Sequence, residues 1–262
     1  DLFGLAEIDA TAGIGNTITR NVAAMKGSGI DLNLQWQHTK GILKWQSDIN
    51  FSANRDEVTQ YYLLTNPGNL LLIGTNRISG QVGRPVYGLY SYRWGGLDGQ
   101  TGNPIGYVNG QPSTDYTYIT ATARTPDEMV YEGRIMPKYF GALGNTFSYK
   151  GLSLSVRVSA KFGYVFRRST INYTNLIGSR QGHGDYALRW QKPGDELHTN
   201  VPSFIYPNSA VRNAFYEYSE ATAEKGGHIR LQYVNLAYAA FKQSRYQSLQ
   251  NLQLFAAGNQ LG

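Results

Sequence analysis

The sequence has no cysteine, which excludes disulfide frameworks, cysteine-ligated zinc sites and thiol nucleophiles. Charge is scarce, at 16% of the 262 residues against roughly 25% in an average soluble domain. The strongest apolar run, Leu70–Ile73, is far shorter than the roughly 18 residues of a transmembrane helix. The opening residues Asp1–Gly4 carry neither the basic start nor the apolar core of a signal peptide. Membrane strands stay possible, because each needs only about 10 alternating residues.

Aromatic residues and glycine are abundant instead. The chain has 20 Tyr, 10 Phe and 4 Trp beside 30 Gly, a composition typical of pleated surfaces with many turns and bulges. The net charge of +6 comes from scattered Lys and Arg, with no block of like charge. We interpret it as a dispersed polar surface, with a lumen that prefers anionic groups as the alternative, and we expect no nucleic-acid partner.

Alternation of apolar and polar residues is the dominant pattern, and it is clearest over Ser153–Phe166. Leu154, Val156 and Val158 point one way, while Ser153, Ser155 and Arg157 point the other. A helix would mix these two sets around its circumference, whereas a strand separates them. At this length the segment is long for a globular strand and ordinary for a tilted barrel strand.

Further strands follow the same rule. Short turns at His38–Gly41 and Lys150-Gly151 join two pairs of them as hairpins. Their expected ranges are Ile30–Gln37, Leu43–Asn54, Tyr139–Tyr149, Ile229–Tyr238 with a bulge-like phase slip between Tyr233 and Val234, and about Leu249–Ala257.

The connections alternate in length. Short turns occupy 37–42 and 149–152, and long Gly/Pro/Tyr-rich stretches occupy about 55–137 and 167–227. This alternation is typical of an antiparallel transmembrane β-barrel, with polar residues toward the lumen and apolar residues toward lipid. We expect one domain over 1–262, with no helix longer than a turn or two. Val86–Trp94 is strand-like and is either a loop hairpin or a further wall strand.

Alternation alone does not separate a barrel from a secreted, soluble β-sandwich that binds carbohydrate, because a sandwich gives the same pattern with its apolar face inward. That reading explains the Tyr and Gly content and the alternation. It does not explain why the long connections lie on one side only.

Ordered motifs carry a resemblance to a known family. No single motif is specific, but they follow one order over nearly the whole chain. They are Met25–Leu32; Trp45–Asn54 with Val58; Val82–Pro85 with Tyr87–Tyr90; Gly96–Asp98 with Thr101–Pro104; Pro137–Gly141 with Asn145, Phe147 and Tyr149–Gly151; Trp190 with Pro193–Asp195; Ile229–Leu231 with Val234 and Leu236–Tyr238; and Gly258–Leu261. In this order they resemble the C-terminal barrel portion of SusC/RagA-type TonB-linked transporters of Bacteroidetes outer membranes.

The resemblance implies an all-β fold, part of a TonB-dependent transporter barrel of about 22 strands with a plugged lumen. It also implies import of glycans or peptides through the outer membrane of a Gram-negative bacterium, with a SusD-like lipoprotein lid. The sequence departs from the family by lacking the plug domain, the TonB box, the early strands and the final strand. We therefore expect it to act with the remaining barrel and plug, and to engage TonB through an N-terminal region absent from this chain.

Chemistry-bearing patterns are weak. His38, His183, His198 and His228 lie at no metal-ligand spacing, and no G-x-S-x-G elbow or Walker loop occurs. Asp98–Asn103 is read as an Asx-type turn rather than a calcium loop. Glycoside hydrolysis needs two carboxyl groups held across a cleft, and the sequence gives no sign of such an arrangement for Asp127, Glu128 and Glu132. No recognisable catalytic motif therefore supports the alternative of a β-rich hydrolase. We expect no catalytic residue, metal or cofactor, and no enzyme.

Aromatic clusters in the long connections are the better candidates for ligand binding. Exposed aromatic faces can stack on sugar rings or grip peptide side chains. The alternative is that they pack the loops together or form a membrane-interface girdle, as expected for Trp36 and Trp45 beside the first turn. The candidate substrate-binding residues are Tyr87, Tyr90, Tyr92, Trp94, Tyr107, Tyr116 and Trp190, with Tyr118 nearby.

Overall fold

The structure, a computed structural model, describes residues 2–7, 17–63, 71–72, 78–121, 125–241 and 252–261. It is mostly β, with one seven-stranded sheet and three two-stranded sheets. The chain divides into two compact units. We call 27–55, 137–163 and 226–262 the sheet unit, and 1–26, 56–136 and 164–225 the loop unit.

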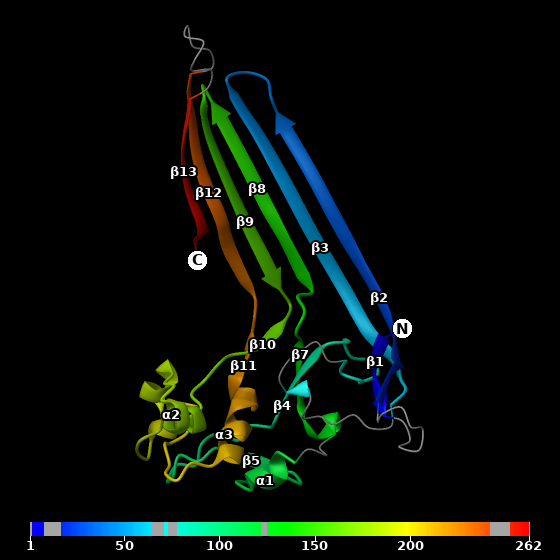
Figure 1. Ribbon diagram of the computed structural model, residues 1–262, viewed down its shortest axis with the longest axis vertical. Helices are drawn as coiled ribbons and strands as arrows, with labels where there is room; N and C mark the ends of the chain where they lie inside the picture. Colours follow the sequence, from blue (N-terminus) through cyan, green and yellow to red (C-terminus); the bar gives the residue numbers. More distant parts are fainter. Residues whose placement is uncertain are drawn as a thin grey trace. The chain divides into compact units, whose positions relative to one another are not determined.

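Long strands lie side by side in the large sheet (Figure 1). In spatial order they are β1 (Leu2–Glu7), β2 (Thr17–His38), β3 (Leu43–Tyr61), β8 (Tyr139–Tyr149), β9 (Leu152–Phe162), β12 (His228–Phe241) and β13 (Leu252–Leu261). The resolved pairings are antiparallel. β2 has 22 residues and β3 has 19, so both extend well beyond the predicted hairpin.

The pairing register places the two short turns at one end of the sheet. Leu43 pairs with Tyr149, which pairs with Leu152. At the other end Ala53 pairs with Tyr139, which pairs with Phe162, and the long connections follow the ends of β3, which continues to Tyr61, and of β9. In the Lys150-Gly151 turn both residues have positive φ, at +45° and +89°, as a tight two-residue hairpin turn requires. The predicted alternation of short and long connections is confirmed for these strands.

Three strand predictions need correction. The strand predicted over Ser153–Phe166 ends at Phe162, because Gly163 has a φ of +74° and redirects the chain. Its last residues enter β10 (Val165–Arg167), which pairs with β11 (Ala223–Lys225).

The phase slip in β12 lies between Leu231 and Tyr233, so Gln232 is the extra residue and the slip begins earlier than predicted. The final strand, predicted over about Leu249–Ala257, is β13, and it ends later than predicted because its backbone pairing continues to Leu261. Residues 249–251 lie outside the described part of the chain.

Short elements build the loop unit. Its strands pair as β4 (Gly88–Ser91) with β7 (Val130–Arg134), β5 (Gly106–Val108) with β6 (Gln111–Ser113), and β10 with β11. Its helices are α1 (Tyr116–Ile119), α2 (Tyr173–Ser179) and α3 (Ala210–Glu217), with 3-10 turns at Pro126–Glu128, Gly184–Leu188, Asp195–Leu197 and Glu220–Thr222. Val86–Trp94 therefore contributes β4 to a two-stranded sheet of the loop unit, so it is neither a wall strand nor half of a local hairpin. No helix within the described ranges has the length and apolar character to cross a membrane.

The loop unit has hydrophobic cores of its own. One core gathers Tyr92, Ile119 and Phe215, and a second gathers Ile171, Tyr173 and Tyr216. α3 contributes to both, because Arg212, Phe215 and Tyr216 follow the spacing of one helix face. Ser209 caps this helix by accepting a hydrogen bond from the Arg212 amide.

Candidate functional site

The sheet unit has one apolar face. From the turn end, the paired rows run Trp45–Phe147–Leu154–Leu236 and Ile49–Leu143–Val158–Leu231 across β3, β8, β9 and β12. Most of these side chains are exposed, with Leu143 at 43%. The large sheet is the one sheet that the described residues of the sheet unit form, so this face has no partner sheet within its own unit. A β-sandwich would bury such a face.

The opposite face is polar. One row crosses the sheet as Asp48, Gly144, Arg157 and Tyr233. Gly144 leaves room there, since a Cβ on it would lie 3.9 Å from both Arg157 Nη1 and Asp48 Cβ. In the next row the hydroxyls of Thr146 and Ser155 lie 3.0 Å apart. The two faces thus differ sharply in polarity, as expected where one side contacts water and the other an apolar medium.

Aromatic rings gather on the apolar face near the turn end. Trp36 and Trp45 meet edge to face with ring centroids 4.5 Å apart, and Trp45 stacks on Phe147 at 5.7 Å. The Asn145 side-chain oxygen accepts hydrogen bonds from Trp45 Nε1 and Ser47 Oγ, both at 3.0 Å. This satisfies the polar atoms of the indole and hydroxyl within an apolar surface.

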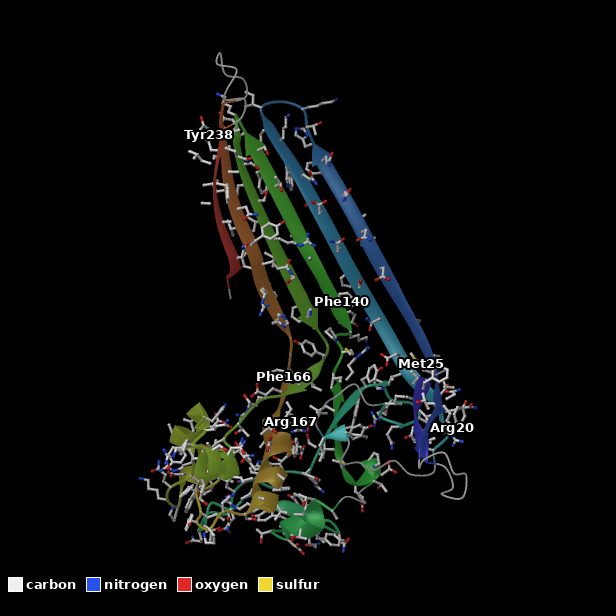
Figure 2. All side chains as sticks on the ribbon, in the orientation of Figure 1. Arg20, Met25, Phe140, Phe166, Arg167 and Tyr238 are labelled. Carbon is white, nitrogen blue, oxygen red and sulfur yellow. The ribbon has the colours of Figure 1, made fainter. Side chains whose placement is uncertain are left out.

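Arg167 joins distant segments of the loop unit (Figure 2). Its guanidinium donates to the carbonyl oxygens of Leu72 at 2.9 Å, Ser219 at 2.9 Å and Tyr90 at 2.9 Å. It also reaches the hydroxyls of Thr222 and Ser91. Burial lowers the pKa of Arg167 to about 10, which leaves it charged at neutral pH.

Arg212 has the same role in another part of the loop unit. It is 2% exposed and donates to Asn103 Oδ1 at 2.8 Å and Ser203 Oγ at 3.0 Å. Gly102 beside it packs on the Trp190 ring, whose Nε1 donates to Glu196 at 3.1 Å. The sequence motifs around Thr101–Pro104 and Trp190–Asp195 therefore meet in space. Neither arginine was predicted, since only tertiary contacts reveal them.

An open cleft of about 610 Å³ lies within the loop unit. Its charged and titratable lining residues are Arg168, Asp185, Arg189, Asp195, His198 and Glu224. Arg168 forms ion pairs with Asp185 at 2.6 Å and Glu224 at 3.1 Å. Burial opposes ionisation of Asp185, but hydrogen bonds from Thr170 and Arg168 outweigh it and lower the pKa of Asp185. These ionised partners give the cleft a fixed charged wall.

The predicted aromatic residues are largely packing residues of the loop unit. Tyr90, Tyr92 and Trp190 are buried, which favours the loop-packing alternative for these three. Rings of Tyr92, Trp94 and Tyr116 lie 5.6–6.1 Å from that of Phe215, a buried residue that sequence reasoning missed. The i, i+3, i+4 pattern of α3 behind a serine cap was the signal for it.

The other four candidates, Tyr87, Trp94, Tyr107 and Tyr116, keep part of their surface. Tyr87 packs at the edge of a third core, and the guanidinium of Arg93 lies 4.3 Å from the Tyr107 ring centroid. The structure does not gather the seven predicted residues into one site, and ligand contact by each of the seven stays a prediction.

The weaker chemical candidates take structural positions. Asp98 Oδ1 accepts hydrogen bonds from the amides of Gln100 and Thr101 and from the Thr101 hydroxyl, so the Asx-type turn is confirmed. Glu128 closes a capping box with Thr125. Within the described ranges, no three His, Asp or Glu side chains gather closely enough to hold a metal ion.

Solved structures of a transporter share this fold. The chain matches a structure of the RagAB peptide transporter with a TM-score of 0.64 and 20% identity, over 97% of this chain and 27% of that chain. It matches the RagAB peptide importer in the closed-closed state (TM-score 0.64, 19% identity, 98% and 28%) and in the open-open state (0.65, 19%, 100% and 27%). No protein-family model and no curated protein matches the chain.

At these identities the likeness shows the fold, and the chain spans little more than a quarter of the matched chains. The predicted resemblance to SusC/RagA-type transporters is confirmed at that level.

Proposed function

We propose that this chain forms part of the barrel wall of an outer-membrane, TonB-dependent importer of glycans or peptides that works with a SusD-like surface lipoprotein. The single observation that carries the proposal is the two-faced sheet, whose apolar side chains are largely exposed over the described parts of β3, β8, β9 and β12. Hydrocarbon is the solvent that suits such a face, while the row with Asp48 and Arg157 suits a hydrated lumen. The fold shared with the RagAB chains adds support.

In this proposal the seven strands are one portion of a closed barrel, because the unpaired edges of an isolated sheet are costly in lipid. The aromatic rings at the turn end belong to the interface girdle, where amphipathic rings gather. The rest of the same transporter supplies the remaining strands, the plug and the contact with TonB. Ligand and lid meet the loop unit, which holds the charged cleft. No reaction chemistry is assigned to the chain.

The test uses the complete protein with an affinity tag in its source cells. Outer membranes are extracted in detergent, and copurifying proteins are identified by mass spectrometry. We expect a surface lipoprotein to copurify. Labelled peptides and oligosaccharides are then offered to cells with and without a protonophore, which removes the energy source of TonB. Uptake of one class that stops with the protonophore supports the proposal. A chain found only in the soluble fraction would return the secreted β-sandwich to first place.

A further inference from the structure

Loop segments that are distant in sequence fix the walls of the cleft in the loop unit. Thr170 and Arg168 both hold Asp185, with Oγ1 and Nη1 each 2.6 Å from Oδ2. Asp195 accepts hydrogen bonds from the amides of Gln191 and Lys192, both at 3.0 Å. The polar groups that build the cleft are thus largely engaged with one another, and the cleft is formed before any ligand arrives.

Arg189 is a cation whose position is fixed by its neighbours while some of its N–H donors remain available. Its Nη1 donates to the Tyr186 carbonyl oxygen at 2.9 Å, and its guanidinium lies 4.1 Å from the centroid of the Tyr186 ring. Nε and Nη2 have no hydrogen-bond partner in the described part of the chain. A guanidinium fixed in this way is suited to bind a carboxylate through two nitrogens.

Glu224 supplies the opposite charge on the same cleft. One of its oxygens pairs with Arg168 Nε at 3.1 Å, and its side chain remains 50% exposed. The other oxygen has no ion-pair or hydrogen-bond partner among the described residues. It can accept from an ammonium group or a peptide N–H. Leu188 and Val201 add apolar surface to the lining between these polar groups.

The lining discriminates between ligand classes. Its one aromatic ring is the imidazole of His198, and it has no Tyr, Trp or Phe, the large rings that suit stacking on a sugar face. It combines an available cation, an available carboxylate and apolar side chains, which match the carboxylate, ammonium and side chains of a peptide. The volume lies within the range of roughly 300–1,000 Å³ that is usual for small-ligand sites.

We infer that this cleft is a peptide subsite, in which Arg189 binds a peptide carboxylate and Glu224 binds a peptide ammonium group. The inference rests on the proposed import function and narrows its ligand class. It assigns binding to the loop unit and to residues outside the aromatic clusters.

Calorimetry on the complete transporter, purified in detergent with its copurifying partner, tests this inference. The probes are Ala-Ala-Leu-Ala-Ala with free ends, its C-amidated form, its N-acetylated form and maltoheptaose. Arg189→Gln is expected to weaken binding of the free peptide about tenfold or more, a loss of roughly 1.4 kcal/mol. It should leave the affinity for the C-amidated peptide unchanged. Glu224→Gln should weaken the free peptide similarly and spare the N-acetylated form. Lys192→Gln, an exposed neighbour outside the lining, is the matched control and should bind like the wild type.

Four results would contradict the peptide subsite. Both variants could bind the free peptide as tightly as the wild type, or the wild type could bind capped and free peptides equally. Alternatively, the wild type could bind maltoheptaose alone, or the variants could lose only the copurifying lipoprotein. The failure of the import proposal looks different. Peptide uptake that survives in both variants removes the subsite and leaves import standing, whereas wild-type cells that take up neither peptide nor oligosaccharide remove import itself.

Discussion

Gly102 lies flat against the indole of Trp190, so closely that a Cβ on Gly102 would come within 2.4 Å of ring atoms Cδ2 and Cε3. The glycine also has a φ of +64°, in the left-handed region. Trp190 is 8% exposed and anchored through Glu196. The two residues therefore lock two loop segments together through a contact that only glycine allows.

Gly102→Ala should destabilise the loop unit by about 2 kcal/mol or more, because the new methyl group collides with a buried ring and the backbone is strained. Thermal unfolding of the complete protein in detergent, followed by tryptophan fluorescence, measures the loss. Gly96→Ala is the control, since Gly96 has a φ of +92° but open space around its Cβ position. Equal losses in both variants would mean that backbone strain, and not the ring contact, explains the effect.

Arg167→Lys should destabilise the loop unit by about 3 kcal/mol although it keeps the charge. A lysine has three donors on one nitrogen and cannot serve the carbonyl oxygens of Leu72, Tyr90 and Ser219 together. The buried oxygens left without partners set the size of the effect. Limited proteolysis of the purified protein should show faster cleavage in the loop unit. Arg93→Lys, at an exposed position, should change the protease resistance little.

The stability of the loop unit should depend on pH through Asp185. Its folded-state pKa lies below its ordinary value of about 3.9, so its stabilising effect is complete above that value and is lost as the pH falls through the folded pKa. Asp185→Asn should therefore cost about 1–3 kcal/mol at pH 7, with a smaller difference from the wild type below about pH 4. Denaturant unfolding at both pH values measures this. A pH-independent cost at Asp185 would contradict the assignment.

The alternation of apolar and polar residues explains why the sheet could be predicted. Leu143 and Ala142 are neighbours that face opposite sides of the sheet, and each strand continues this alternation. A few adjacent residues therefore indicate the strand, the hairpin and the face on which each side chain lies. Gly163, where β9 ends, and Gln232, the extra residue in β12, show what this alternation predicts less well. A glycine inside an alternating run signals a break, but no local rule fixes where a bulge inserts its extra residue.

Long-range contacts explain what could not be predicted. Arg167 reaches Tyr90, 77 residues earlier, and Arg212 reaches Asn103, 109 residues earlier. Nothing near Arg167 distinguishes it from the exposed arginines, and the helical spacing that places Arg212 on a face with Phe215 does not identify its partners. Tyr92 and Tyr116 were predicted as ligand-binding residues because their contacts are also long-range. They pack against Phe215, which lies on a helix more than 90 residues later in the sequence.

Leu143→Arg should impair membrane insertion of the complete protein, whereas Ala142→Arg should be tolerated. Leu143 lies at the middle of β8 on the apolar face, beside Ile49 and Val158. A cation at the bilayer midplane costs roughly 2–4 kcal/mol on the lipid side of a barrel. Ala142 lies on the polar face, between Asn50 and Ser159, where water can solvate the new charge. The two substitutions introduce the same side chain at adjacent positions of β8. The β-propensity of the new residue and its place in the chain are therefore the same, and the face of the sheet differs. The fraction of folded, protease-resistant protein in the outer membrane measures the effect. Equal loss in both variants, or loss only for Ala142→Arg, would show that the apolar face does not meet lipid.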